Sequence, residues 1–282
     1  MAASYRRGSF LMNKIRKFFV SAIIGIALLL NISVVNAVDL KDTTKTSQIN
    51  RGVVPLAYNT TADKKLKVIV EKDGKKVTYN LKNDGTVEYF PLQYGNGNYK
   101  VSVLENISGT KYKYLKSETV KLNLKNPNDV YLSSVQNINW NENMAAIKKA
   151  SELTKGLKND SDKIKKIYQF AVNNFSYDYE KLKTLSNDYL PDIDKTLKAK
   201  KGICYDYSSM IAAMLRSQGI PTKLVKGYAD NVDGYHAWNE IYDKSKEKWI
   251  IVDATYDSQM KAAKVKYSFE KKASAYRKVN EY

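Results

Sequence analysis

The chain has 282 residues, and its 47 basic residues exceed its 29 acidic ones by 18. The lysines are spread along both halves, and no basic stripe carries the residues of a nucleic-acid-binding motif, so we expect no nucleic acid as a partner. A single cysteine excludes an internal disulfide. One cysteine and one histidine are also too few for the usual zinc ligands, and we expect neither a metal nor another cofactor.

Residues 1–37 have the pattern of a secretory signal peptide. Five basic residues precede an apolar run over 18–35, and Ala37 ends a small-residue cleavage pattern. The alternative is a retained transmembrane anchor. It is disfavoured because the run is near the lower length limit for spanning and contains Asn31 and Ser33.

Cleavage after Ala37 would leave 245 residues with a net charge of +13, because five of the 47 basic residues and no acidic residue are removed. We therefore expect a secreted protein, extracellular or associated with the cell wall, that has no membrane contact once the signal is removed. A basic exported protein is attracted to anionic polymers, which makes anionic cell-wall polymers candidate partners.

Two regions of different pattern follow the signal segment. Residues 38–60 are polar, and we expect a flexible leader there. Residues 61–126 are predicted to form a small β-sandwich module, because short runs rich in β-branched and aromatic residues alternate with turn residues such as Asp73-Gly74. The predicted strands are 66–72, 76–82, 86–90, 98–106, 110–116 and 118–124.

The period becomes helical after Pro127, and we assign residues 127–282 to a second domain. Apolar residues spaced three and four apart predict a helix from about 160 to 175 and a weaker one over 144–157. The same spacing predicts a helix from Cys204 to about Gln218, which ends before Gly219.

Cys204 therefore lies in the first turn of a helix. The free N–H groups and the dipole at that end favour negative charge, and hence the nucleophilic thiolate. The same N–H groups are suited to stabilise an oxyanion. The alternative interpretation is a buried cysteine that acts as a small hydrophobic residue.

His236 lies in a predicted strand, 235–242, which a polar turn joins to a second predicted strand, 249–255. A register symmetric about Lys244 and Ser245 would place His236 directly opposite Asp253. Opposite residues share a face of the sheet, with Cβ atoms about 4.5–5.5 Å apart, so the carboxylate could orient the imidazole. A register shift of one residue would separate them.

These observations predict a catalytic triad: Cys204 as nucleophile, His236 as general base and acid, and Asp253 as the group that holds the histidine tautomer. Each residue alone has a more common structural explanation. Their joint pattern is what favours catalysis, because the chain has no other cysteine or histidine.

The segments 202–204, 214–221, 227–228, 236–240 and 249–255 resemble the transglutaminase-like core, which shares its catalytic layout with papain-like proteases. The resemblance covers roughly residues 140–260 and implies an α+β fold in which the cysteine helix packs on an antiparallel sheet. It assigns the triad to Cys204, His236 and Asp253. Thr222-Lys223 departs from the family pattern, where an alanine and an arginine are frequent.

The resemblance implies a thioester between Cys204 and a glutamine or amide acyl donor. An amine would resolve it in a cross-linking enzyme, and substrates would be proteins or peptides with Gln and Lys side chains. Two alternatives remain open: a cysteine protease or amidase acting on proteins or cell-wall peptides, and a noncatalytic wall-associated binding protein.

Overall fold

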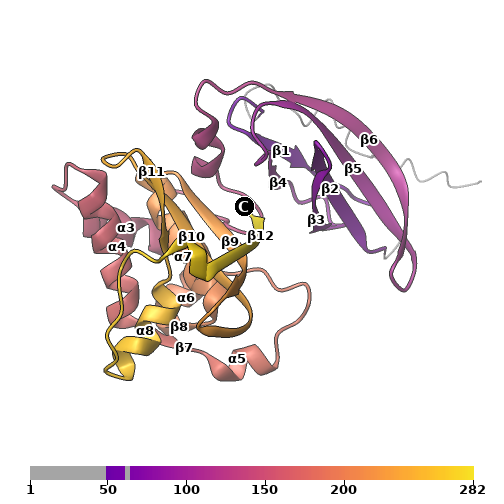
Figure 1. Cartoon of the computed structure of the whole chain (residues 1–282). Coiled ribbons are helices and arrows are strands. Elements are labelled where there is room, and N and C mark those ends of the chain that lie inside the picture. The colour runs from indigo at the N-terminus through magenta and orange to yellow at the C-terminus, as the bar shows by residue number, and fades with distance from the viewer. Residues whose placement is uncertain (1–48, 61–63) are drawn as a thin grey trace, which may run out of the picture. The chain divides into compact units, whose positions relative to one another are not determined.

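A computed structural model describes residues 49–60 and 64–282 of the chain (Figure 1). The predicted signal peptide over 1–37 and residues 38–48 of the predicted leader lie outside the described residues. Within the described part of the chain, no helix is long and apolar enough to cross a membrane.

The β-rich region comprises a four-stranded antiparallel sheet, in the order β3-β2-β5-β6, and a two-stranded antiparallel ribbon of β1 and β4. The two are in contact, since the ring of Phe90 in β4 packs edge-on against Tyr79 in β3 with centroids 5.1 Å apart. The strands are β1 (Val53–Leu56), β2 (Leu66–Lys72), β3 (Lys75–Leu81), β4 (Glu88–Pro91), β5 (Gly97–Ser108) and β6 (Lys111–Leu122).

Two predictions for this region are wrong in part. The leader predicted over 38–60 contains β1, whose four residues are all buried and pair with β4, as Val54 does with Phe90. The two strands predicted over 110–116 and 118–124 are one continuous strand, β6. Irregularities in its register with β5 allow the pairing to continue along both long strands.

The remainder of the chain is a mixed α and β region whose main sheet is antiparallel, in the order β11-β10-β9-β12. This confirms the predicted fold class. Its elements are η1 (Pro127–Leu132), α3 (Ala145–Thr154), α4 (Asp160–Asn174), β7 (Ser176–Tyr177), α5 (Tyr179–Lys183), α6 (Ile193–Ala199), β8 (Lys201–Gly202), α7 (Cys204–Ser217), β9 (Thr222–Ala229), β10 (Val232–Asp243), β11 (Lys248–Val252), α8 (Ala254–Ala262), η2 (Ala273–Ala275) and β12 (Tyr276–Glu281).

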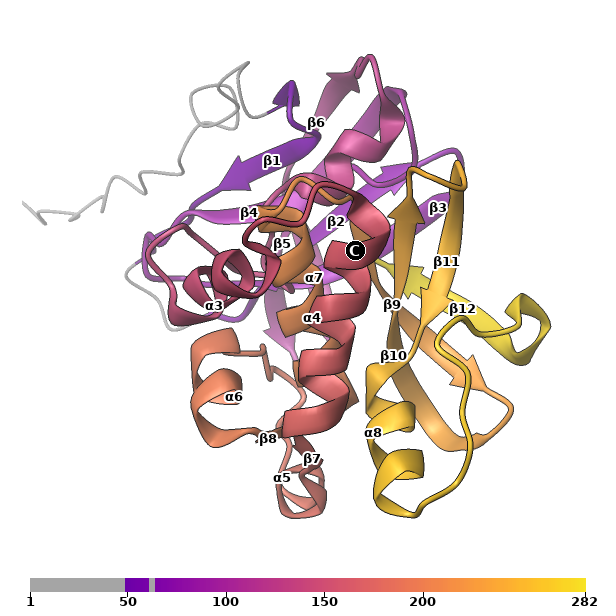
Figure 2. The same ribbon diagram turned by 90° about the vertical axis from the view of Figure 1, so that its left-hand side faces the viewer.

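Helix α7 is the centre of this region. It contacts α3, α4 and α6 and also packs against β9 and β10, as Figure 2 shows. The apolar residues that predicted the helix, from Tyr207 to Leu215, are almost completely buried. A helix covered on all sides has its position determined by its neighbours, so its first residue, Cys204, is held in a defined place.

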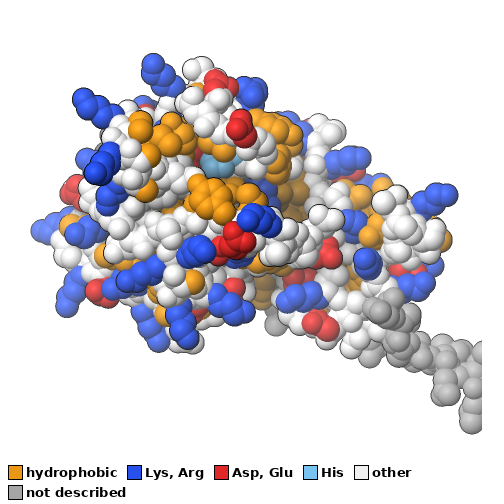
Figure 3. All heavy atoms as spheres, turned by 90° about the horizontal axis from the view of Figure 1, so that it is seen from below, with side chains coloured by type: hydrophobic (Ala, Val, Ile, Leu, Met, Phe, Trp, Pro, Cys, Tyr) orange, Lys and Arg blue, Asp and Glu red, His pale blue; other side chains and the backbone are white. Residues whose placement is uncertain are grey.

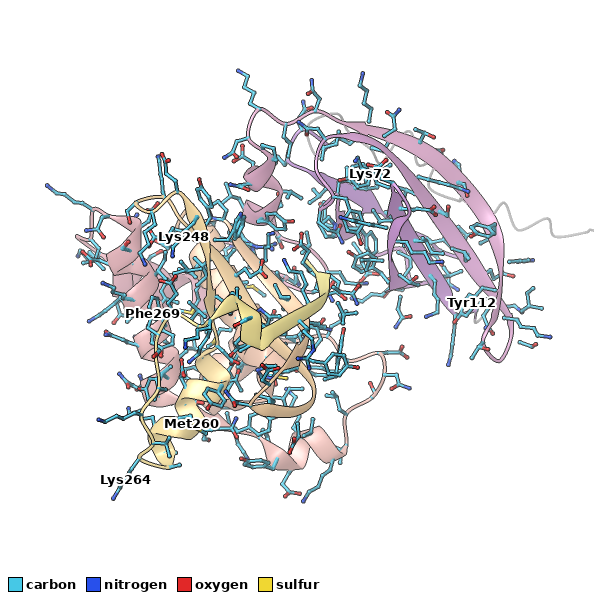
Figure 4. All side chains as sticks on the ribbon, viewed as in Figure 1. Lys72, Tyr112, Lys248, Met260, Lys264 and Phe269 are labelled. Carbon is cyan, nitrogen blue, oxygen red and sulfur yellow. The ribbon has the colours of Figure 1, made fainter. Side chains whose placement is uncertain are left out.

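Helix α8 begins directly after β11 and packs against α4. Tyr168 of α4 donates a hydrogen bond to the buried carboxylate of Asp257 in α8, at 2.8 Å. Phe269, labelled in Figure 4, packs edge-on against the Tyr168 ring with centroids 4.8 Å apart. These contacts anchor the helix whose first turn follows Asp253.

Hydrogen bonds join the β-rich region to the α and β region. The Tyr131 hydroxyl lies 3.1 Å from the Gln93 carbonyl oxygen and 2.6 Å from a carboxylate oxygen of Glu281 in β12. The described residues, 49–60 and 64–282, fall within one compact unit.

Candidate active site

Cys204 is the first residue of α7 and is half-buried. The preceding turn is fixed by the buried carboxylate of Asp206, which accepts a hydrogen bond from the Ile203 backbone N–H at 2.9 Å and one from the Lys181 ammonium at 2.6 Å. Gly202 is required beside it, since a Cβ there would lie 2.8 Å from the Asp206 Cβ. The cysteine therefore occupies a rigid helix N-terminus, as the sequence predicts.

His236 lies in β10, where it pairs with Gly227 of β9. Its Nε2 atom is 2.7 Å from the Oδ2 atom of Asp253, and both side chains are buried, at 4% and 0% exposed. This contact occupies one ring nitrogen. Nδ1 is then the nitrogen left to exchange a proton with a neighbouring group.

Asp253 reaches His236 by a different route from the predicted one. The hairpin pairs Asn239 with Val252 and Asp243 with Lys248, so the register is shifted by two residues and His236 is not directly opposite Asp253. The centre of the turn lies between Ser245 and Lys246, one residue later than assumed, because Asp243 pairs with Lys248. Within this turn Asp243 accepts a hydrogen bond from the Ser245 N–H and Glu247 adopts a left-handed φ of 51°. A shift of two residues preserves the face, so the pair still meets diagonally.

The second strand of the hairpin is also shorter than predicted. It ends at Val252, and Asp253 is the N-cap of α8, with Oδ1 accepting a hydrogen bond from the Tyr256 N–H at 3.0 Å. The predicted strand over 249–255 is therefore wrong at its last three residues. The capping bond fixes one carboxylate oxygen and leaves Oδ2 for the histidine.

Tyr276 is a site residue that the sequence analysis missed. Its hydroxyl donates a hydrogen bond to Asp253 Oδ2 at 3.0 Å, from the first position of β12. Asp253 thus accepts bonds from Tyr256, His236 and Tyr276. With three donors its carboxylate is held in one orientation.

Trp238 supports the imidazole from the same strand. Its ring stacks on His236 with centroids 6.3 Å apart and meets Tyr276 edge-on at 5.0 Å. Figure 3 shows the only pale-blue side chain, which is the chain's single histidine, in a hollow between hydrophobic side chains. The aromatic neighbours limit rotation of the ring and reduce its access to water.

The surroundings of His236 favour its protonated form. Burial lowers the pKa of the imidazole, but the adjacent charge of Asp253 and its hydrogen bond outweigh burial and raise the pKa to about 10. The neighbouring Cys204 side chain acts in the same direction. The structure thus brings Cys204, His236 and Asp253 together, with the imidazole between thiol and carboxylate.

Asn239, which follows Trp238 on the strand, ties the sheet to the cysteine helix. Its amide donates hydrogen bonds to the Ser208 carbonyl oxygen of α7 at 2.9 Å and to the Lys223 carbonyl oxygen of β9 at 3.1 Å. Cys204 and His236 are therefore linked through backbone contacts as well as through their side chains. Among the described residues no group of three or more His, Cys, Asp or Glu side chains is placed to hold a metal.

Comparison with known proteins assigns the region around this site to a family. Residues 147–254 match the transglutaminase-like superfamily. The chain therefore contains a transglutaminase-like domain, and Cys204, His236 and Asp253 all lie inside it.

Two curated relatives match part of the chain. Over 124 residues it is 32% identical to an uncharacterized protein, YebA, of Bacillus subtilis (strain 168), which covers 38% of this chain and 17% of that protein. Over 119 residues it is 31% identical to a UPF0252 protein of Methanocaldococcus jannaschii, which covers 38% and 33% of the two chains. The chain thus spans a third or less of each relative's length.

Solved structures of similar fold include a candidate cysteine protease from Cytophaga hutchinsonii, which has a TM-score of 0.44 and 17% identity over 80% of this chain and 73% of that one. The periplasmic domain of TgpA from Pseudomonas aeruginosa has a TM-score of 0.36 and 16% identity, over 70% and 91%. A structure described as a TGase has a TM-score of 0.31 and 22% identity, over 39% and 29%.

Proposed function

We propose that the protein is a secreted thiol enzyme that transfers acyl groups through a thioester on Cys204. The observation that carries this proposal is the buried pair of His236 and Asp253, 2.7 Å apart, beside the only cysteine of the chain. The match of residues 147–254 to the transglutaminase-like superfamily adds support to this proposal. A binding protein with no catalytic role has no need of a buried imidazolium next to a thiol at a helix N-terminus.

In the first step the Cys204 thiolate attacks the carbonyl carbon of a glutamine carboxamide or a peptide amide. The new S–C bond moves an electron pair onto the carbonyl oxygen. When the tetrahedral intermediate collapses, the C–N bond breaks and His236 gives its Nδ1 proton to the departing nitrogen. The products are a thioester and ammonia or an amine.

The developing oxyanion forms at the start of α7. The Cys204 backbone N–H and the positive end of the helix dipole lie there, and both favour negative charge. Asp253 remains ionised and keeps His236 in the tautomer that presents Nδ1 to the sulfur.

In the second step an amine or a water molecule attacks the thioester. His236 removes a proton from the attacking group, the C–S bond breaks, and the thiolate and imidazolium return to their starting state. A lysine-like amine makes the protein a cross-linking transglutaminase, and water makes it an amidase or protease. We favour the acyltransferase, with a hydrolase as the alternative that the experiment must separate.

The experiment uses the mature chain, a glutamine-containing donor protein and a labelled primary amine, with Cys204→Ala and Cys204→Ser as matched variants. We expect amine incorporation by the natural protein and none by either variant. Ammonia release or cleavage without incorporation would identify a hydrolase. Equal signals from all three proteins would refute a Cys204 enzyme altogether.

A further inference from the structure

One lysine close to the candidate nucleophile has no anionic partner. The Lys226 ammonium lies 3.4 Å from the centre of the Tyr205 ring and 5.4 Å from that of Tyr282. Within the described part of the chain no carboxylate is within 4.0 Å of it, whereas Lys223, on the same strand, pairs with Glu281 at 3.2 Å. The cation at position 226 is therefore balanced only by aromatic faces.

Lys226 lines a cavity of about 150 Å³, here named the Lys226 pocket. The residues of the pocket used in this argument are Asn137, Asp188, Tyr189, Tyr205, Lys226 and Tyr282. Four of the residues that line it are tyrosines and most of the others are polar, and the pocket is of a size for a small group rather than for a folded segment. A single cation that has no carboxylate partner, in a pocket of this size, favours a compact anion.

A second unsatisfied group lies in the same pocket. The Asn137 side chain is buried and donates a hydrogen bond to the Tyr205 hydroxyl at 2.6 Å, which fixes the amide in place. Its Oδ1 atom is buried without a hydrogen-bond partner. Because that oxygen is closed to solvent, the amide forms part of the wall behind the pocket and holds Tyr205 in place.

The pocket adjoins the candidate active site. Tyr205 follows Cys204 in the chain, and Lys226 precedes Gly227, the residue that pairs with His236. Burial lowers the pKa of Lys226 to about 8, and the Cys204 side chain acts in the opposite direction. The lysine is still mostly protonated at pH 7.

One acidic residue faces the pocket and must be considered. Asp188 is exposed on the rim, and its carboxylate accepts a hydrogen bond from the Asn80 amide at 2.6 Å. It is solvated and already has a donor, so its repulsion of an incoming anion is screened by water. Lys226 lies deeper than Asp188, so its positive charge decides whether the pocket prefers an anionic or a neutral ligand.

We propose that the Lys226 pocket binds a carboxylate-bearing residue of the acyl donor, with Lys226 pairing with the carboxylate. The preferred donor is a peptide with a carboxylate close to the reacting amide. An acidic side chain and a peptide's C-terminal carboxylate share this chemistry. The inference rests on the proposed function, because it assumes that Cys204 is the attacking group.

The test measures how fast Cys204 is alkylated, which requires a reactive thiol but no acyl transfer. Cys204 is the only cysteine, so the reaction reports on one site. The probes are N-bromoacetyl-glycine, the neutral N-bromoacetyl-glycinamide, and N-bromoacetyl-aspartic acid α-amide, whose carboxylate is on a side chain. The proteins are the natural chain, Lys226→Met, Lys226→Arg, and Lys111→Met as an exposed lysine with the same change of charge.

At pH 7 we expect the ratio of acid-probe to neutral-probe rates to fall about tenfold in Lys226→Met, the effect of losing one charge-assisted bond. Lys226→Arg and Lys111→Met should keep most of the ratio. Faster alkylation by the glycine probe would identify a terminal carboxylate as the ligand. Faster alkylation by the aspartate probe would identify an acidic side chain as the ligand.

Two results would overturn the inference, and both leave the ratio of acid-probe to neutral-probe rates unchanged in Lys226→Met while its near-ultraviolet circular dichroism shows a native fold. In one, neither rate changes, so Lys226 has no part in the reaction. In the other, both rates fall equally, which would mean that Lys226 acts on the thiolate rather than on the substrate. Neither result depends on transamidation or hydrolysis, so failure of the pocket and failure of the proposed function are distinguishable.

Discussion

At the residue scale, the imidazole of His236 is held between a thiol and a carboxylate. Because the chain has one histidine, its ring gives a single set of NMR signals that can be titrated without assignment. We expect a pKa well above 6.5, near the value of about 10 that the adjacent Asp253 imposes.

Asp253→Asn should bring the pKa of His236 down to 6.5 or below, because burial then acts without the opposing carboxylate. Cys204→Ala should lower it by a smaller amount. A pKa near 6.5 in the natural protein would mean that the ion pair does not form.

Tyr276 is a positioning residue, since it touches Asp253 and not the substrate. Tyr276→Phe removes one hydrogen bond to a charged group but keeps the ring that packs on Trp238. We expect kcat to fall about tenfold with KM little changed, consistent with a loss of about 1.5 kcal/mol. Tyr228→Phe, at an exposed position, is the control. A rise in KM at constant kcat would contradict the assigned role.

The sequence predicted Cys204, His236 and Asp253 because each carries a local signal: a cysteine at a helix start, a histidine in a strand and an aspartate at a strand end. Tyr276 carries none. It is one of 22 tyrosines, and its contact with Asp253 depends on β12 pairing with β9 rather than on any pattern near residue 276. A contact that depends on pairing between strands far apart in the sequence cannot be predicted from the local spacing of apolar residues.

At the element scale, the hairpin shows why a prediction can reach the right pair by the wrong register. The first predicted strand lies within β10, but the midpoint of the turn was assumed to lie between Lys244 and Ser245, one residue too early. Asp243 forms the last pair of the hairpin with Lys248, and residues 244–247 form the loop between them. Each residue of β10 therefore pairs with a residue two positions further along the chain than predicted. Because side chains alternate between the two faces of a strand, a shift of two residues leaves His236 and position 253 on the same face.

Gly227 of β9 allows β12 and the Trp238 ring of β10 to pack closely against β9 beside His236. A Cβ at this position would overlap the backbone oxygen of Arg277 in β12 and lie 2.9 Å from the Trp238 ring. We expect Gly227→Ala to reduce the free energy of unfolding by about 2–3 kcal/mol, because β12 or the ring must shift. Urea unfolding measures this. Tyr228→Ala, at the exposed neighbour, should change little, and equal stability of both variants would show that the strands can separate freely.

At the scale of the whole molecule, His236 links stability to pH. Its pKa is raised on folding, so the stabilisation from its protonated form is complete below pH 6.5 and is lost as pH rises toward about 10. We expect the melting temperature to fall across that interval in the natural protein and to fall less in Asp253→Asn. The same slope in both proteins would assign the effect to other groups.

The net charge makes a separate prediction about partners. The full chain carries +18, or +13 after cleavage behind Ala37, and its lysines are spread along both halves of the sequence rather than gathered in a motif. We propose that the mature protein binds anionic cell-wall polymers through long-range attraction. Binding to isolated walls should then weaken steeply as salt is raised toward about 1 M, where the screening length is only about 3 Å. Binding that is insensitive to salt would exclude this form of attraction.

The thioester itself can be observed directly. The protein is incubated briefly with 4-nitrophenyl acetate at neutral pH, quenched in acid and examined by intact-mass and peptide mass spectrometry. The account predicts one acetyl group on Cys204 that hydroxylamine removes, with none on Cys204→Ala and a much slower reaction in His236→Ala. An adduct located elsewhere, or one formed equally by Cys204→Ala, would contradict it.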